Sequence, residues 1–122
     1  MQHILIVEDN RDIAALYQRA LFKYQHTLVS SAEKALEKLK DQSYDLIILD
    51  LHLAEMSGLH LLEHIRAQPD GEKVKVFVIS ADDLLKPKCE TLGIQAWMTK
   101  PIEIDVFMDT VDRWVNQPAT HK

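Results

Sequence analysis

The sequence has little of several features that mark other classes of protein. It contains a single cysteine, Cys89, which excludes an internal disulfide and fits a reducing compartment such as the cytoplasm. We expect Cys89 to be a buried filler rather than a reactive thiol. No apolar run approaches the roughly 18 residues of a membrane span. The opening residues, Met1 to Ile4, have no basic segment followed by a long apolar one, so we expect no signal peptide.

The sequence also lacks a basic stripe. The net charge is -5, and the basic side chains form at most one loose group: Lys73, Lys75, Lys86 and Lys88. Direct binding of DNA or RNA is therefore not expected. A chain of 122 residues suits one domain, which we place at residues 1–116 with a C-terminal tail at 117–122. Either the protein works alone, or the chain is cut from something longer.

What the sequence does contain is an alternation of strand-like and helix-like segments. Strands are predicted at 3–8, 27–30, 44–50, 74–79 and 94–99. Apolar spacing predicts buried helix faces made of Ile13, Leu16, Tyr17, Ala20 and Leu21, and of Ile104, Phe107, Met108, Val111 and Val115. A capping box over 30–33 is predicted to begin the second helix, Ser57 to cap a third at 58–67, and Gly93 to end a fourth. This order predicts an α/β fold with a parallel sheet covered on both faces.

Reactive side chains stand at the ends of four predicted strands. Glu8 and Asp9 follow the first, Asp50 ends the third, Ser80 follows the fourth, and Lys100 follows the fifth. Because the carboxyl ends of parallel strands meet at one edge, these groups are expected to converge where open α/β sheets bind ligands. Three carboxylates repel one another unless a cation separates them, and oxygen ligands suit Mg²⁺.

Four motifs in order, at nearly matching spacings, carry a resemblance to a known family. They are Val7-Glu8-Asp9-Asn10, the pattern Asp-Leu-x-Leu-x-x-Met-Ser-Gly over 50–58, Ser80-Ala81, and Gly93-x-x-x-Trp97-x-Thr99-Lys100-Pro101. With them, the chain resembles the receiver domain of bacterial two-component response regulators over residues 3 to about 116. The resemblance implies a flavodoxin-like (βα)5 three-layer sandwich, with a five-stranded parallel sheet in the order 2-1-3-4-5.

The resemblance also assigns roles to the acidic residues. Asp50 would be the phosphoacceptor, since a carboxylate can attack phosphorus to form an acyl phosphate. Mg²⁺ would be held by Asp9 and Asp50, by Glu8 through water, and by the backbone carbonyl of His52. The residues two positions after the phosphoacceptor and the hydroxyl residue, His52 and Asp82, would flank the path of the hydrolytic water and tune dephosphorylation.

The remaining implied roles concern the phosphoryl group and the switch. Lys100 would neutralise a phosphoryl oxygen and would be aimed by a cis peptide bond before Pro101. Ser80 would donate a hydrogen bond to a phosphoryl oxygen and move toward it. Trp97 stands where the family usually has Tyr or Phe, a ring that turns inward when the hydroxyl moves. The larger Trp ring needs more room and a partner for its N–H, so a static edge aromatic or a partner contact is an equal alternative.

Three further departures from the family pattern affect the surroundings of the site. Residues 54–55 are Ala-Glu where the family often has Pro-Gly. The interval from Ser80 to Gly93 is about two residues short, and Pro87 falls inside it, which predicts a short fourth helix beginning near 86–87. Ala96 stands where one DNA-binding subfamily has Asp, so the charged dimer face of that subfamily is not reproduced.

The function implied by the resemblance is a signalling switch. A sensor histidine kinase or a histidine phosphotransfer protein would donate the phosphoryl group to Asp50 with Mg²⁺ as cofactor. An output protein or domain of unknown identity, or a second copy in a homodimer, would then read the face of the fourth helix, fifth strand and fifth helix. Such a domain is not an enzyme with a separate substrate, since it catalyses its own phosphorylation and dephosphorylation only.

Other functions remain open at this stage. A metal-dependent phosphatase with an aspartyl nucleophile typically has a second acid two residues later, where this chain has His52. A receiver fold can also serve as a constitutive interaction module. His60-Leu-Leu-Glu63-His64 matches the inverted zinc-protease pattern, but both histidines are predicted to face solvent, so a solvated helix face is the favoured interpretation.

Overall fold

The computed structural model describes residues 2–53 and 57–117, which form five β-strands that alternate with five α-helices. In chain order these are β1 (His3–Val7), α1 (Arg11–Ala20), β2 (Gln25–Val29), α2 (Ala32–Asp41), β3 (Leu46–Asp50), α3 (Gly58–Ala67), η1 (Gly71–Lys73, a short 3-10 helix), β4 (Val76–Ser80), α4 (Lys86–Leu92), β5 (Ala96–Thr99) and α5 (Ile104–Val115). The observed strand ends differ from the predicted ones by no more than two residues, as expected for boundaries.

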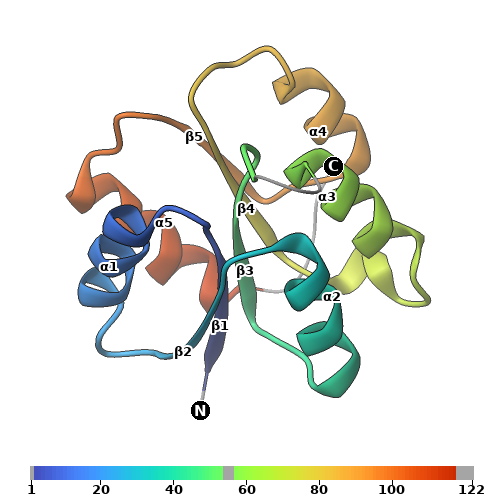
Figure 1. Ribbon diagram of the computed structural model, residues 1–122, viewed down its shortest axis with the longest axis horizontal. Helices are drawn as coiled ribbons and strands as arrows, with labels where there is room; N and C mark the ends of the chain where they lie inside the picture. The colour runs from blue at the N-terminus through green and yellow to red at the C-terminus, as the bar shows by residue number, and fades with distance from the viewer. Residues whose placement is uncertain (1, 54–56, 118–122) are drawn as a thin grey trace.

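The five strands form one parallel sheet in the order β2-β1-β3-β4-β5. Helices α1 and α5 cover one face, and α2, α3 and α4 cover the other, which gives three layers (Figure 1). The predicted doubly wound flavodoxin-like fold and its strand order are confirmed. In the described part of the chain, we find no helix long and apolar enough to cross a bilayer.

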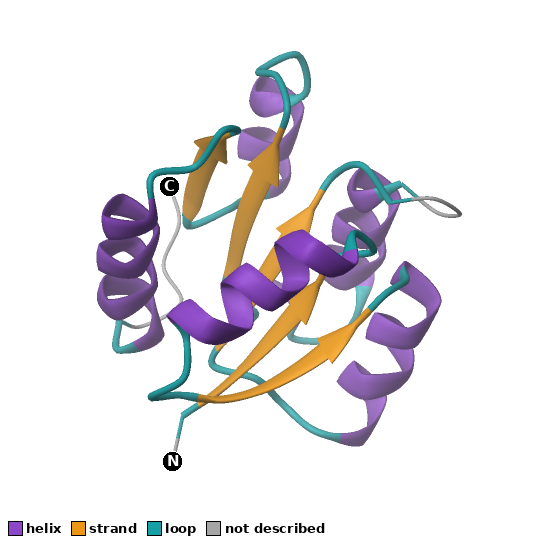
Figure 2. Ribbon diagram, turned by 60° about the vertical axis from the view of Figure 1, so that its left-hand side comes forward, coloured by secondary structure: helices purple, strands orange, loops and turns teal. Residues whose placement is uncertain are grey.

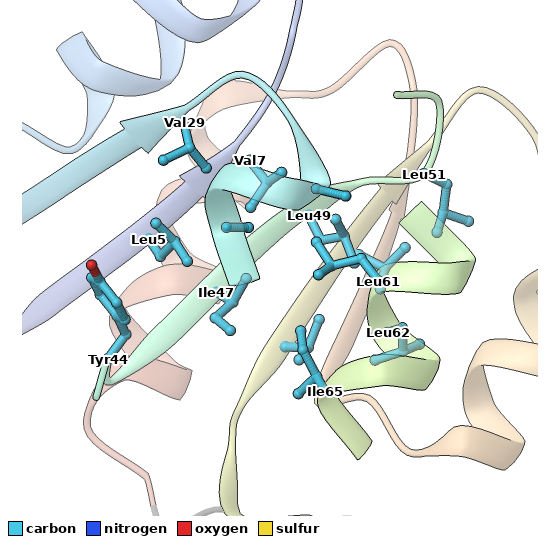
Figure 3. Packing of buried hydrophobic residues seen from close by; sticks show 14 of the residues in the cluster. Leu5, Val7, Val29, Tyr44, Ile47, Leu49, Leu51, Leu61, Leu62 and Ile65 are labelled. Carbon is cyan, nitrogen blue, oxygen red and sulfur yellow. The ribbon is translucent and has the colours of Figure 1, made fainter. Parts of the chain in front are cut away.

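The core is divided by the sheet into two buried clusters, because successive strand residues point to opposite faces. Leu5, Val7, Ile47 and Leu49 face α2 and α3 (Figure 3). Their chain neighbours face the other way and pack with residues of α1 and α5, among them Tyr17, Phe107 and Val111. The central strands are therefore apolar on both faces, which is the pattern that predicted a covered parallel sheet.

Helix caps follow the sequence closely, with one correction. Asn10 accepts from the amides of Asp12 and Ile13, and Ser57 caps α3 over the predicted range. The predicted capping box over 30–33 is wrong. The N-cap of α2 is Ser31, whose hydroxyl accepts from the Lys34 amide, so the helix begins one residue later than a box starting at Ser30 requires.

Two predicted core residues lie at the surface instead. Leu16 and Ile104 are exposed, at 38% and 36%, and Ala14 is buried in α1. Each of the two helices buries a narrow stripe against the sheet, so apolar residues at the margins of the predicted stripe reach solvent.

The fourth helix is short, as predicted. It spans seven residues, Lys86–Leu92, with Pro87 in its first turn, where proline has no helical hydrogen bond to break. It ends at Gly93, whose φ of 99° is accessible to glycine at little cost. Cys89 is buried in this helix as expected, and burial raises the pKa of its thiol to about 11.

Two cations hold the amino edge of the sheet, opposite the edge where the strands end. Arg66 donates from Nε and Nη2 to the Gly93 carbonyl at 3.0 and 2.6 Å, and from Nη1 to the carbonyls of Gly71 and Val74, both at 2.7 Å. Lys75, only 9% exposed, donates to three carbonyls at the end of α5: those of Trp114, Val115 and Gln117. Each cation thus binds backbone carbonyls at the ends of helices and turns.

Candidate functional site

The strand ends bring the predicted acidic residues together at the carboxyl edge of the sheet. All five strand arrows point to this edge (Figure 2). Val7 pairs with Leu49 in register, so Glu8, directly after β1, lies beside Asp50 at the end of β3. Ser80 ends β4, which neighbours β3, and Lys100 directly follows β5. The sheet order therefore places one hydroxyl and one ammonium on the opposite side of Asp50 from Glu8.

Asp50 is buried and held at both carboxylate oxygens. It is 3% exposed. Its Oδ1 accepts from the His52 amide at 2.9 Å, and its Oδ2 accepts from Lys100 Nζ at 2.7 Å. Lys100 is bonded through its backbone as well, since its amide donates to the Ser80 carbonyl at 2.8 Å. The peptide bond between Lys100 and Pro101 is cis. These hydrogen bonds fix the orientation of the carboxylate. Among the described residues, Lys100 supplies the one ammonium that lies near enough to pair with it.

Glu8 is a buried carboxyl group whose surroundings disfavour its charged form. It is 2% exposed, its Oε2 accepts from the Asn10 amide at 3.1 Å, and its Oε1 has no hydrogen-bond partner among the described residues. Burial first, and the adjacent Asp50 carboxylate second, raise the pKa of Glu8 to about 8. The Asn10 amide and, less strongly, Lys100 oppose this shift but do not cancel it. Two buried carboxylates thus share a single ammonium, an arrangement that a bound cation would relieve.

Asp9 follows Glu8 in the loop between β1 and α1, where it is half-buried. Capping of α1 falls to the next residue, Asn10, which accepts from two helix amides. Asp9 is therefore not the N-cap of α1. Asp9 lies on the same loop as Glu8 and is more exposed than Glu8.

The hydroxyl residue of the site lies between the loops after β3 and β4. Ser80 is 2% exposed, and its Oγ lies 3.4 Å from His52 Nε2 and 3.4 Å from the Asp82 amide. His52 and Asp82 are themselves exposed. The Asp82 carboxylate accepts from the Leu84 amide at 2.9 Å, which shapes the loop before α4. The two residues expected to tune dephosphorylation thus lie at the solvent side of Asp50 and Ser80.

Gly58 lets α3 begin directly against the end of β3. Its amide donates to the Leu51 carbonyl at 3.0 Å. A Cβ at this position would lie 2.6 Å from both the Asp50 carbonyl oxygen and the Leu51 Cα, much closer than real Cβ atoms approach backbone. The glycine of the motif is therefore required by packing against the segment that carries the site.

Beside the site, the side chain of Trp97 is turned toward the loop that follows β4. Trp97 is half-buried, packs at the margin of the core cluster under α2 to α4, and donates from its indole nitrogen to Asp83 Oδ1 at 3.0 Å. Sequence reasoning did not single out Asp83. Nothing in the pattern distinguishes it from Asp82 next to it, because which of the two reaches Trp97 depends on the path of the loop.

Two other features of the sequence lie apart from the site. His60 and His64 are exposed on α3, and no group of three or more His, Cys, Asp or Glu side chains within 2–53 and 57–117 is arranged to hold a metal ion by itself. A zinc site at this helix therefore has no support. The Ala54-Glu55 departure falls outside the described residues.

Comparison with known proteins agrees with this arrangement of fold and residues. The family model described as "Response regulator receiver domain" matches residues 4–112. The receiver domain of the sensor histidine kinase PA1611 of Pseudomonas aeruginosa, solved with magnesium in its active site cleft, has a TM-score of 0.85 at 28% identity and covers 95% of this chain and 98% of its own. The response regulator TrrA of Thermotoga maritima, in complex with Mg²⁺ and beryllofluoride, has a TM-score of 0.82 at 25% identity, covering 93% and 99%.

Curated relatives extend the comparison to longer proteins. The sensory/regulatory protein RpfC of Xanthomonas campestris is 33% identical over 116 residues, which are 88% of this chain and 16% of RpfC. The transcriptional regulatory protein MalR of Bacillus subtilis is 36% identical over 113 residues, 88% of this chain and 47% of MalR. The chain thus spans about half or less of these relatives.

A parallel five-stranded sheet with an aspartate, a lysine and a hydroxyl at its carboxyl edge defines a phosphoacceptor module of signal transduction. The chain belongs to the response regulator receiver domain family, and it is a receiver domain of two-component systems. Receiver domains are phosphoacceptors, and they interact with histidine kinases and with output domains.

Proposed function

We propose that Asp50 accepts a phosphoryl group from a sensor histidine kinase or a histidine phosphotransfer protein, in a reaction that depends on Mg²⁺. The observation that carries this proposal is the contact of the buried Asp50 with Lys100, 2.7 Å apart, beside Glu8, whose Oε1 has no hydrogen-bond partner among the described residues. An aspartate needed only for stability has no use for a second, destabilising carboxylate at its side.

The donor set fits Mg²⁺. The residues that would hold it are Asp9, Asp50, the His52 carbonyl and, through water, Glu8. Mg²⁺ binds few carboxylates and keeps several waters, so a site without a complete cage of side chains suits it. The buried Glu8 Oε1, which has no partner in the described chain, supports a cation nearby. When bound, the metal neutralises charge on the phosphoryl oxygens.

The chain's own residues supply position and charge for the transfer. A carboxylate oxygen of Asp50 attacks phosphorus, a P–O bond forms, and the P–N bond to the donor histidine breaks with its electron pair leaving on the imidazole. Lys100 exchanges its partner from Asp50 Oδ2 to a phosphoryl oxygen, and Ser80 donates its hydroxyl hydrogen to another. Phosphoryl transfer requires this placement of charges more than covalent help from the protein.

His52 and Asp82 are proposed to tune the lifetime of the acyl phosphate. Both lie at the solvent side of the site, where water must enter to attack phosphorus. Asp82 can orient that water, because a hydrogen-bond acceptor is what an attacking water needs. Asp82→Ala should then lengthen the half-life of the phosphoprotein. An unchanged or shorter half-life in a timed decay assay would count against this role.

The finer details of partners and boundaries are also part of the proposal. The domain spans residues 1–116 with a tail at 117–122, and it acts in the cytoplasm, where Cys89 stays reduced. An output protein or domain, or a second copy in a homodimer, reads the face of α4, β5 and α5. Phosphorylation of Asp50 changes that face by shifting a two-state equilibrium.

The domain is proposed to act on itself rather than on a separate substrate. It would form and hydrolyse its own acyl phosphate. His52 stands where a metal-dependent phosphatase of this type has its second acid. Steady turnover of a generic phosphomonoester such as p-nitrophenyl phosphate, lost in Asp50→Asn, would favour the phosphatase alternative instead.

Labelling by acetyl phosphate tests the proposal directly. With Mg²⁺ present, intact-mass measurement should detect the gain of one phosphoryl group, and hydroxylamine should remove it. Excess chelator should abolish the gain, and Asp9→Asn should reduce it strongly because a ligand charge is lost. Equal labelling with and without the metal would overturn the Mg²⁺ dependence, and labelling of another aspartate would overturn the assignment of Asp50.

A further inference from the structure

Outside the phosphoryl site, two side chains donate to the same carboxylate oxygen. Asp83 Oδ1 accepts from the indole nitrogen of Trp97 at 3.0 Å and from the Thr99 hydroxyl. The Trp97 nitrogen also lies 3.2 Å from Thr99 Oγ1. Asp83 belongs to the loop between β4 and α4, whereas Trp97 and Thr99 belong to β5. A single aspartate therefore ties this loop to the edge strand.

The carboxylate of Asp83 is well suited to hold Trp97 where it lies. An indole nitrogen can only donate, so a ring of this size is stable where its N–H finds an acceptor. The Thr99 and Trp97 donors lower the pKa of Asp83, so it accepts these bonds as an anion. The ring also lines a cavity of about 640 Å³ between α4 and β5. Hydrogen bonds to Asp83 and Thr99 thus hold the half-buried Trp97 ring beside space that could admit movement.

The same loop connects Asp83 to the phosphoryl site. Asp83 is three residues beyond Ser80, whose Oγ accepts from the Asp82 amide at 3.4 Å. On the far side, the Asp83 carbonyl accepts from the Lys86 amide at 3.1 Å, at the start of α4. A displacement of the Ser80 hydroxyl toward Asp50 would therefore pull on the segment that carries Asp83 and on the first turn of α4 together.

We propose that Asp83 is a latch that holds Trp97 in the outward position in the unphosphorylated chain, and that phosphorylation of Asp50 releases it. The proposal rests on the proposed function, because release requires the movement of Ser80. Asp83 is a positioning residue, which acts through Trp97 and Thr99 and not on the reacting atoms. The latch opposes activation, so removing it should make the active state easier to reach.

The presence of Trp97, where the family usually has Tyr or Phe, then has a specific consequence. A Phe in the same place could not bond to Asp83, and a ring without that bond is free to turn without losing a hydrogen bond. In this chain the inward turn requires that the bonds to Asp83 be broken first. The short α4, which adjoins the same loop and cavity, is the element whose position then changes.

The test uses Trp114→Phe as the parent, so that Trp97 is the one remaining tryptophan of the two in the chain. Trp97 emission and acrylamide quenching are recorded before and after addition of Mg²⁺ and beryllofluoride, a phosphoryl mimic. Half-saturation by beryllofluoride is measured from the rise in melting temperature. In Asp83→Ala we expect the ligand-free emission to move toward that of the saturated parent. Half-saturation should fall by about threefold to tenfold, as expected for the loss of about 1 kcal/mol of hydrogen bonding.

Matched variants separate the latch from a change of charge or fold. Asp109→Ala removes an exposed aspartate of α5 and should match the parent. Asp83→Asn keeps an acceptor oxygen without the charge, and should lie between Asp83→Ala and the parent. In Trp97→Phe the ring cannot bond to Asp83, so adding Asp83→Ala should change half-saturation less than it does when Trp97 is present.

The outcomes distinguish failure of the latch from failure of the proposed function. If Asp83→Ala leaves both the emission of ligand-free Trp97 and half-saturation at the parent values while acetyl phosphate still labels Asp50, the latch is overturned and the proposed function stands. If the parent itself neither binds beryllofluoride nor is labelled at Asp50, the proposed function is overturned and the latch falls with it.

Discussion

The two edges of the sheet treat buried charge in opposite ways. At the amino edge, Arg66 and Lys75 donate to backbone carbonyls, so their charges are matched by the ends of helices and turns. At the carboxyl edge, Glu8 and Asp50 share one lysine, and Glu8 Oε1 has no partner among residues 2–53 and 57–117. Buried charge is therefore well paired at the amino edge and incompletely paired at the carboxyl edge, where the chemistry is expected.

This difference indicates that the amino edge contributes to the stability of the fold, whereas the carboxyl edge lowers it. Buried polar groups with complete partners make a fold rigid and specific, whereas incompletely paired groups persist only when the rest of the structure compensates. A receiver domain needs its carboxylates close together before the cation and the phosphoryl group arrive. The amino edge, far from that site, carries no such demand.

The largest effect is expected from Asp50→Asn. The amide keeps the shape of the carboxylate but cannot form an acyl phosphate, so the hydroxylamine-labile mass increase should disappear. The same change removes one of two adjacent buried charges, so the folded state should not be weakened. Intact mass and a urea unfolding curve check both statements. A label that persists in this variant would contradict the assignment of the carboxyl edge.

Arg66→Met should destabilise the amino edge of the sheet. The variant leaves the carbonyls of Gly71, Val74 and Gly93 without their donor, and we expect a loss of about 3–4 kcal/mol in the free energy of unfolding. Urea denaturation measures it. Arg19→Met, an exposed arginine on α1, is the matched control and should change stability little. A loss no larger than that of the control would show that the hydrogen bonds of Arg66 are dispensable for stability.

Glu8→Gln should instead stabilise the carboxyl edge. The pKa of Glu8 in the folded state is raised from 4.5 to about 8, so the folded chain keeps a proton that the unfolded chain releases between these values. Stability in chelator should therefore fall as pH rises from 4.5 toward 8. Glu8→Gln should flatten this slope. If the variant shows the same slope as the parent, the charge at Glu8 is compensated in a way the geometry does not reveal.

Lys75→Met is expected to have a smaller effect, of about 2 kcal/mol, since the lost ammonium bonds the last carbonyls of one helix only. Hydrogen exchange should localise the loss to the end of α5. Lys73→Met provides the control, because Lys73 is exposed and its ion pair with Asp70, 3.4 Å apart, contributes little. Equal losses in the two variants would argue against the anchoring of α5 by Lys75.

The fold and the acidic site were largely predictable from the sequence, and for physical reasons. Apolar runs specify buried parallel strands, and a residue that ends such a strand must stand at the carboxyl edge, which placed Glu8, Asp50, Ser80 and Lys100. The roles of Arg66, Lys75 and Asp83 were not predictable. Each acts through contacts with backbone or side chains distant in sequence, and these depend on loop paths that periodicity does not encode. The exposure of Leu16 likewise reflects the width of the stripe that the sheet covers.

Protection by Mg²⁺ at two pH values tests the unsatisfied carboxyl edge most directly. Unfolding in urea is compared with Mg²⁺ and with chelator, at about pH 6 and about pH 9, on either side of the pKa of Glu8. At the higher pH Glu8 is ionised in the ligand-free chain, so bound Mg²⁺ relieves more repulsion and displaces no proton. We predict a clearly larger gain in stability at the higher pH, and a smaller difference between the two pH values in Glu8→Gln. Equal protection at both pH values, or none at either, would contradict the account.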